Sequence, residues 1–221
     1  MSTKTKKTAT AKIEKRETQR PEVGPAMLGC EIMVACLERE GVDTIFAYPG
    51  GASMVMHQAL TRSKKIRTYL PRHEQGGVFA AEGYARATGK ASVLLSHLSP
   101  GLTNAATGVA NAALDSIPMV VIAGDVPSHY YGKHPHQEVN LHADASQSEI
   151  YRPFVKRAWR VDSAHLFPEI LEKAFALAES GRPGPVLVDV PMGIFSQEVE
   201  VALFERLRQN AKTFAKPSLD E

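Results

Sequence analysis

Apolar residues recur along residues 25–195 in two alternating patterns. The first pattern is amphipathic, and its first stretch places apolar residues three or four positions apart at Met27, Cys30, Val34 and Leu37. This is the spacing of one face of a helix, and Gly41 belongs to the residue type that most often ends one. The second pattern is a short continuous apolar run, first seen at 44–48, which is typical of a strand buried on both faces.

The two patterns alternate in a regular order. Further strands are predicted at 66–70, 92–96, 119–123 and 186–190. Further helices are predicted from Ser53, a candidate N-cap, to Leu60, and at about 74–88, 101–115 and 165–179. Strands joined by helices of this length form parallel crossover units, so we expect an α/β protein with a parallel sheet covered by helices on both faces. The segment 125–160 is less regular and receives no elements.

The two ends of the chain differ from this central region. Residues 1–24 contain seven Lys or Arg against three Glu, so they carry +4 and the remainder carries −2. A segment with so few apolar residues cannot offset its ordering entropy, and we expect 1–24 to be a disordered basic tail. The alternative is a targeting segment, although this stretch lacks the apolar core of a secretory signal and contains acidic residues, which organelle transit peptides mostly avoid. Residues 196–221 are expected to form a linker toward a further domain.

Composition narrows the class of protein. No apolar run approaches the ~20 residues that span a membrane, and the basic charge is confined to the tail. We therefore expect one domain over 25–195, cytoplasmic, without a membrane or nucleic-acid partner. Cys30 and Cys36 are six positions apart on one predicted helix and do not share a face, so they are expected to be buried thiols in a reducing compartment.

One carboxylate stands at the junction of a predicted strand and a predicted helix. Glu74 follows the strand at 66–70, within Arg72-His73-Glu74-Gln75-Gly76, and begins the helix at 74–88. Open parallel sheets bind ligands beyond the carboxyl ends of their strands, so this side chain is expected to face such a crevice. The alternative is a surface glutamate that complements the helix dipole.

Five sequence motifs follow one another in the central region. They are Tyr48–Met54 with His57–Arg62, Arg72–Gly76 with Gly83–Arg86, Pro100–Gly101 with Thr103–Asn104, Asp115–Met119, and Gly181–Pro191. In their order and spacing they resemble the thiamine-diphosphate (ThDP) dependent enzymes, specifically the acetolactate synthase type. The resemblance implies that residues 25–195 are the N-terminal, pyrimidine-binding domain of a transferase or lyase that decarboxylates and joins 2-oxo acids.

In that family the residue that matches Glu74 activates the cofactor. ThDP reacts as a carbanion at its thiazolium C2, and its own aminopyrimidine removes the proton in the imino form. A carboxylate that shares a proton with the pyrimidine ring in a poorly hydrated pocket favours this form. The resemblance therefore implies that Glu74 is catalytic.

The resemblance also implies further site residues. Those for cofactor binding are Pro49, Gly50, Gly51, Glu74, Pro100 and Asn104. Those for the substrate pocket are Gly51, Ala52, Gln137 and Lys156. Some of them have a plainer alternative, because Pro49-Gly50-Gly51 also suits a tight turn, and Gln137 and Lys156 also suit solvated positions.

Two departures from the family pattern leave the substrate open. Residues 98–104 read Leu-Ser-Pro-Gly-Leu-Thr-Asn where the family has Ser-Gly-Pro-Gly-Ala-Thr-Asn, and Gln137 lacks the aromatic residue that usually precedes it. The same region contains three histidines, His134, His136 and His142. No Cys or paired carboxylate completes a set of ligands with them, so no metal site is predicted.

Parts of the family's full-length enzyme have no counterpart in the sequence. In the family a second ThDP domain holds Mg²⁺ and the diphosphate with a Gly-Asp-Gly motif, and Gly124-Asp125-Val126 lacks the second glycine. We therefore expect a site shared with a diphosphate-binding domain of the same gene or of a partner subunit, in a homo- or hetero-oligomer. FAD is expected only in a full-length context, and the chain alone is expected to be inactive. The alternatives are a non-catalytic interaction or regulatory fragment that pairs with a full-length relative, and the pyrimidine-binding subunit of a split decarboxylase.

Overall fold

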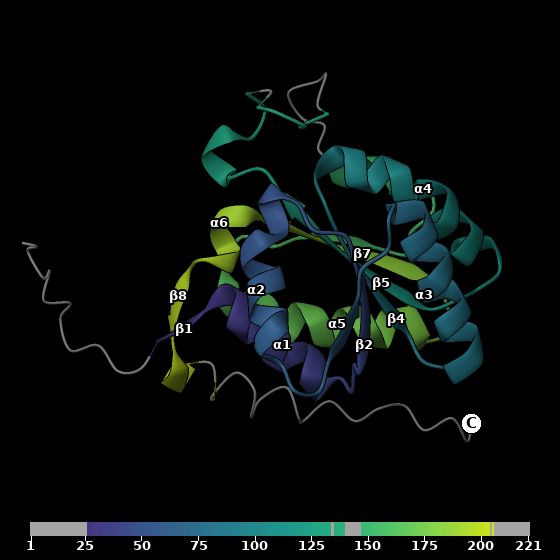
Figure 1. Ribbon diagram of the computed structural model, residues 1–221, viewed down its shortest axis with the longest axis horizontal. Coiled ribbons are helices and arrows are strands. Elements are labelled where there is room, and N and C mark those ends of the chain that lie inside the picture. Colours follow the sequence, from purple (N-terminus) through teal and green to yellow (C-terminus); the bar gives the residue numbers. More distant parts are fainter. Residues whose placement is uncertain (1–25, 134, 140–146, 204, 206–221) are drawn as a thin grey trace, which may run out of the picture.

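A six-stranded parallel sheet forms the centre of the molecule (Figure 1). The computed structural model describes residues 26–133, 135–139, 147–203 and 205. In spatial order the strands are β3 (Arg67–Tyr69), β2 (Thr44–Ala47), β4 (Ser92–His97), β5 (Met119–Asp125), β7 (Pro185–Pro191) and β6 (Ala158–Arg160). Every neighbouring pair is parallel, which confirms the fold class expected from the sequence.

Helices cover both faces of this sheet. The longer ones are α1 (Gly29–Arg39), α2 (Met54–Arg62), α3 (Glu74–Thr88), α4 (Leu98–Leu114) and α5 (Phe167–Glu179). The first, second and fifth bury their apolar sides in one core, whereas α3 and α4 pack into the other. Strand residues alternate between the two, so that Val93 and Leu95 belong to the first core and Leu94 to the second.

Three short strands and one short helix were not predicted. β1 (Ala26–Leu28) pairs antiparallel with β8 (Glu198–Glu200) in a separate two-stranded sheet, and the one-turn helix α6 (Met192–Phe195) precedes β8. Three residues are too few to show a strand period, so Met27 was wrongly placed on the helix that begins at Gly29. β6 was missed for the same reason, inside the segment that received no elements.

Several other expectations concern single residues or segments. Cys30 and Cys36 are buried on α1 and are not joined in a disulfide, as expected. Ser53 does stand at the start of α2, but its side chain makes no capping hydrogen bond. No described helix is long and apolar enough to cross a membrane. The expected tail at 1–24 and the linker residues 206–221 lie outside the described residues.

Candidate active site

Four chain segments meet at the carboxyl ends of the central strands. β2 runs into the Pro49–Ser53 loop, β3 leads to Glu74 at the start of α3, β4 ends at His97, and β5 passes through Gly124. The backbone N–H of Tyr48 donates to the carbonyl of Leu95 at 3.1 Å, so this loop begins directly beside β4. The parallel register therefore gathers the predicted cofactor-binding segments at one edge of the sheet.

Glu74 is buried at this edge. It is the first residue of α3 and only 5% exposed, and the Nδ2 of Asn104 donates to its Oε2 at 3.0 Å. The preceding His73 is the N-cap, and its ring nitrogen accepts from the backbone N–H of Gln75 at 3.2 Å. The helix start is thus capped by a neighbouring side chain, and the Glu74 carboxylate does not serve as the cap.

Gly101 allows Ser96 and Glu74 to pack closely against the first turn of α4. A Cβ atom at Gly101 would lie 3.3 Å from the Glu74 Oε1 and 2.3 Å from the Oγ of Ser96. The Ser96 Oγ is itself buried and has no hydrogen-bond partner among the described residues. Any larger side chain at position 101 would therefore push into Ser96 and crowd Glu74, which explains the glycine of the Pro100-Gly101 motif physically.

The Pro49–Ser53 loop approaches the neighbouring strands closely. A Cβ at Gly124 would lie 2.7 Å from the carbonyl oxygen of Ala52, and the backbone N–H of Ser53 donates to the Gly50 carbonyl at 3.0 Å. Ala52 is buried in a small apolar cluster with Leu98 and Val126. Gly51 is exposed with open space around its missing side chain, so these two predicted pocket residues occupy different environments.

The segment that carries Gln137 is fastened to the start of α4. The backbone N–H of Val139 donates to the Ser99 Oγ at 2.9 Å, and Ser99 is one of the residues that depart from the family pattern. Gln137 is exposed and has a φ of 70°, in the left-handed region that non-glycine residues adopt rarely. Its segment therefore reaches the same end of the sheet as Pro100, which is exposed in the first turn of α4.

Lys156 lies at the opposite end of the sheet. Its Nζ donates to the carbonyl oxygens of Leu177 and Ser180, at the carboxyl end of α5, and its backbone N–H donates to Pro185, where β7 begins. These contacts compensate the carbonyls that a helix end leaves unpaired. The structure thus brings Gly51, Ala52 and Asn104 to the edge that holds Glu74 and does not bring Lys156 there.

Only one of the three histidines considered for a metal lies within the described residues. His134 and His142 lie outside the described residues, and His136 is exposed. Within residues 26–133, 135–139, 147–203 and 205, no three His, Cys, Asp or Glu side chains are grouped so as to hold a metal ion.

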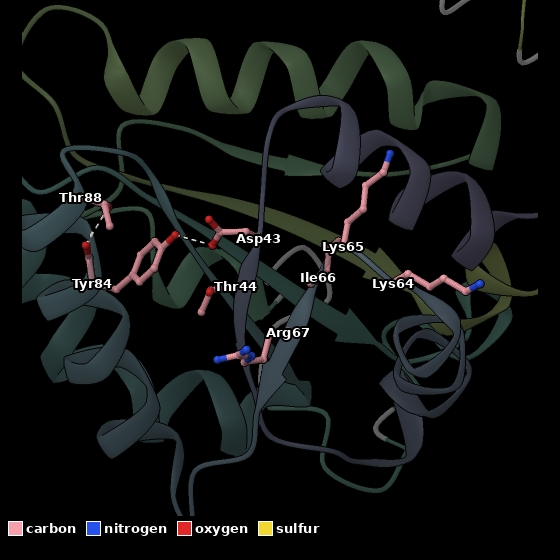
Figure 2. Close-up of a pocket in the computed structure, with 8 residues that line it drawn as sticks. All are labelled: Asp43, Thr44, Lys64, Lys65, Ile66, Arg67, Tyr84 and Thr88. Atoms are coloured by element: carbon pink, nitrogen blue, oxygen red, sulfur yellow. Dashed lines mark hydrogen bonds between the residues drawn. The ribbon is translucent and has the colours of Figure 1, made fainter.

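A surface hollow of about 660 Å³ lies away from Glu74, at the amino ends of β2 and β3 (Figure 2). The Tyr84 hydroxyl donates to the Asp43 carboxylate at 2.5 Å, and this hydrogen bond lowers the pKa of Asp43. Lys64 and Lys65 extend outward in different directions and do not converge on a common point. The size of this hollow does not by itself indicate a functional site, and we place the candidate site at Glu74.

A second pair of carboxyl groups was not singled out from the sequence. Asp125 and Asp189 lie on the adjacent strands β5 and β7, and each has one buried oxygen without a hydrogen-bond partner among the described residues. Gln147 donates to the Oδ1 of Asp189 at 2.7 Å, and Arg160 lies 3.7 Å from Asp125. Burial, reinforced by the nearby Asp125, raises the pKa of Asp189 to about 8.

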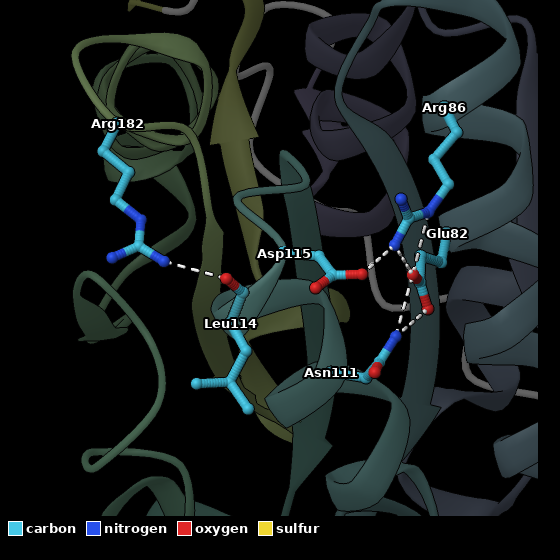
Figure 3. A network of polar contacts seen from close by, with 6 residues as sticks. All are labelled: Glu82, Arg86, Asn111, Leu114, Asp115 and Arg182. Carbon is cyan, nitrogen blue, oxygen red and sulfur yellow. Dashed lines mark hydrogen bonds and ion pairs between the residues drawn. The ribbon is translucent and has the colours of Figure 1, made fainter.

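A second buried glutamate explains part of the motif that follows Glu74 (Figure 3). The Oε1 of Glu82 accepts from both Nε and Nη2 of Arg86, at 3.0 and 2.5 Å, and both its oxygens accept from Asn111 Nδ2 at 2.9 Å. Arg86 also pairs with Asp115. These hydrogen bonds and ion pairs connect α3 to α4, so Arg86 of this motif has a structural role.

Comparison with known proteins agrees with this geometry. The family described as "Thiamine pyrophosphate enzyme, N-terminal TPP binding domain" matches residues 27–147, more than half of the chain. The chain belongs to this family. The match covers Glu74, the Pro49–Ser53 loop and Asn104, and therefore every part of the candidate site around the buried carboxylate.

Among curated members of the thiamine pyrophosphate enzyme family, the similarity is to plant acetolactate synthases. The chloroplastic enzyme of Arabidopsis thaliana is 53% identical over 169 residues, which are 76% of this chain and 24% of that protein. Acetolactate synthase 2 of Nicotiana tabacum is 52% identical over 171 residues, 77% of this chain and 25% of that protein. The chain thus spans about a quarter of the length of these relatives. They are named as chloroplastic, which differs from the cytoplasmic location expected here, and the location of this chain stays a prediction.

Proposed function

We propose that this domain forms the pyrimidine-binding half of a ThDP site in an acetolactate synthase-like enzyme, and that Glu74 activates the cofactor. The observation that carries the proposal is the buried Glu74 carboxylate, which accepts from Asn104 at one oxygen and lies beside Gly101 and Ser96 at the other. A carboxylate with a single described side-chain donor, on Oε2, has a second oxygen that can accept a proton-sharing contact from an aromatic nitrogen.

The residues present fit the pyrimidine end of the cofactor. Ser96 offers an unpaired buried hydroxyl next to Gly101, and the Pro49–Ser53 loop brings backbone close to the same edge. When bound, the cofactor supplies a carbon nucleophile for 2-oxo acid chemistry. Within this chain Glu74 would share a proton with the pyrimidine ring, Asn104 would orient its carboxylate, and Pro100 and Gly51 would flank the ligand.

The remainder of the site is proposed to come from elsewhere in the assembly. Because the described residues contain no group of His, Cys, Asp or Glu side chains that could hold a metal ion, the diphosphate and Mg²⁺ would be held by a diphosphate-binding domain of the same gene or of a partner subunit. Large apolar side chains are exposed near the Glu74 edge, among them Leu70 at 67% and Phe79 at 43%. Such residues suit contact with a second domain or subunit. FAD would belong to a full-length context only.

Exchange of the C2 proton of bound ThDP tests the role of Glu74. In an assembly with a partner that carries the Gly-Asp-Gly motif, Glu74→Gln keeps the side-chain shape but cannot share a proton as the acid does. The exchange, followed by NMR in deuterium oxide, should slow by about 10²–10⁴-fold. An unchanged rate would reject the catalytic proposal and favour an interaction or regulatory fragment that retains the fold.

Calorimetry on the isolated chain tests its dependence on a partner. We expect weak ThDP binding that Mg²⁺ does not strengthen, and no turnover of pyruvate, because the described residues offer the pyrimidine half alone. Tight binding that requires Mg²⁺ would contradict the shared site and leave the role of Glu74 untouched.

A further inference from the structure

His97 is a polar residue of the Glu74 edge that the proposed function leaves without a task. It is the last residue of β4 and pairs in register with Gly124 of β5. On its other side β2 continues into the loop that contains Gly50. His97 therefore stands between two strands at the point where the loop, Glu74 and β5 converge.

The imidazole of His97 occupies the space next to Gly50. A Cβ atom at Gly50 would lie 1.7 Å from the Nε2 and 1.9 Å from the Cδ2 of the ring. No side chain at position 50 could coexist with the ring in this place. The glycine of the Pro49-Gly50-Gly51 motif thus has a specific consequence here, since it admits a histidine to the candidate site.

The backbone after His97 fixes this arrangement. Leu98 has a φ of 51°, in the left-handed region that is costly for a residue with a side chain, and it is buried against Ala52 and Val126. A conformation of this kind persists only where its surroundings determine it. Leu98 is directed into the apolar cluster, while the ring of His97 packs on Gly50.

The hydrogen bonding of His97 is incomplete. Its Nδ1 is buried and has no hydrogen-bond partner among the described residues. His57, on the far side of the same loop, places its Nδ1 2.9 Å from the Ser53 carbonyl, so that nitrogen bears the proton. The Nε2 of His57 then has only a lone pair, and it too is buried without a partner within the described part of the chain.

Burial disfavours the charged form of both imidazoles. Burial lowers the pKa of His97, and His57 acts in the same direction, whereas the negative charge of Glu74 opposes them. Burial likewise lowers the pKa of His57. A neutral imidazole has one donor and one acceptor, and leaving either unpaired in a buried place costs free energy that a bound polar group would recover.

We propose that His97 is a ligand-contacting residue of this site, whose ring forms a hydrogen bond with an oxygen of the 2-oxo acid bound beside Glu74. It would thereby help to hold the 2-oxo acid in the site. The inference rests on the proposed function, because it requires a ligand at the Glu74 edge. It assigns His97 to the substrate and leaves the activation of the cofactor to Glu74.

NMR of the whole chain with ¹³C-labelled histidine tests this assignment. Thiamine diphosphate with Mg²⁺ is added first, and pyruvate is then titrated as the probe. We expect the first addition to move the amide signals of Gly101 and Asn104, and the second to move the His97 Cε1–H signal. The signal of His165, an exposed residue beyond β6, should stay in place. His97→Gln should weaken the binding of pyruvate about five- to tenfold and leave that of thiamine diphosphate within about twofold, whereas His165→Gln should change neither.

The outcomes separate the two proposals. If thiamine diphosphate moves Gly101 and Asn104 but pyruvate leaves the His97 signal unchanged, the role of His97 is rejected and the proposed function stands. Equal pyruvate affinities of His97→Gln and His165→Gln reject it as well. If thiamine diphosphate, added at a concentration that saturates the weak binding expected of the chain alone, moves neither amide, the proposed cofactor site fails, and the inference on His97 fails with it. Because the chemical shift is measured on the unchanged chain, the test does not depend on the folding of a variant.

Discussion

Two glutamates on α3 are buried to the same extent but differ in the number of their hydrogen-bond donors. Glu74 and Glu82 are each 5% exposed, and each accepts a hydrogen bond from an asparagine of α4. Glu82 receives two further donors from Arg86 at Oε1, while Asn111 also donates to Oε2, so both its oxygens are engaged. Glu74 has one described side-chain donor and a glycine beside its other oxygen. A buried carboxylate with all its partners holds a fold together, and one with few partners is available to a ligand.

The comparison predicts its largest effect in catalysis. In an assembled enzyme, Glu74→Gln should lower turnover of pyruvate by about 10²–10⁴-fold, because a general acid–base group is lost. Glu82→Gln should stay within about threefold of the parent, since its partners are structural. Steady-state kinetics at equal folded fraction measures both, and similar losses in the two variants would break the distinction.

The same two variants should rank in the reverse order when their effect on the free energy of unfolding is measured. Glu82→Gln replaces charge-assisted hydrogen bonds to Arg86 by weaker ones and should lower the free energy of unfolding by about 2 kcal/mol. Glu74→Gln should change it by less than about 0.5 kcal/mol. Urea denaturation followed by circular dichroism gives both values, and a large loss in the Glu74 variant would show that this carboxylate is also structural.

Asp189 extends the comparison to a carboxyl group that burial keeps protonated. Its pKa of about 8 in the folded state lies above the ~3.9 of an unfolded aspartate, so between these values the folded chain holds a proton that the unfolded chain has released. Unfolding free energy should therefore fall as pH rises from about 5 to 7, with this residue contributing about 1 kcal/mol per pH unit. Asp189→Asn should flatten the dependence in urea titrations at several pH values. An unchanged slope would mean that Asp189 is ionised when folded.

The two asparagines offer the smallest and most closely matched test. Asn111→Ala should lower unfolding free energy by about 1 kcal/mol, because Glu82 loses its amide donor. Asn104→Ala should cost less stability and instead slow C2 exchange about fivefold, since Glu74 would be less well oriented. Equal stability losses with unchanged exchange would assign Asn104 to the fold alone.

The sequence predicted β4, β5 and β7 well because these strands are buried on both faces. Runs such as 119–123 and 186–190 are rich in apolar residues, and the structure places both in the middle of the sheet. β1, β6 and β8 have three residues each, and their pairing depends on distant partners that no local pattern encodes. Elements set by burial were therefore accessible from the sequence, and elements set by pairing were not.

The candidate site was predictable only in part, for a related reason. Glu74 and Asn104 stand in motifs, and the structure joins them by a hydrogen bond that the sequence does not show. Lys156 was placed in the substrate pocket by its position in the chain, yet three-dimensional order puts it at the other end of the sheet. His97 was not predicted, because its place in the site depends on the contact of its ring with Gly50. This contact is seen only in the folded structure, where the two segments lie side by side.

The pairing of β1 with β8 brings the two ends of the described domain together. Ala26 lies opposite Glu200, so the polypeptide enters and leaves the fold at one point (Figure 1). Because its two ends are neighbours, such a unit can be inserted into a longer polypeptide, or duplicated within one, at a single position. No strand of the central sheet has to be interrupted. The small two-stranded sheet thus makes the domain a transferable module, which would carry its proposed half of the site with it.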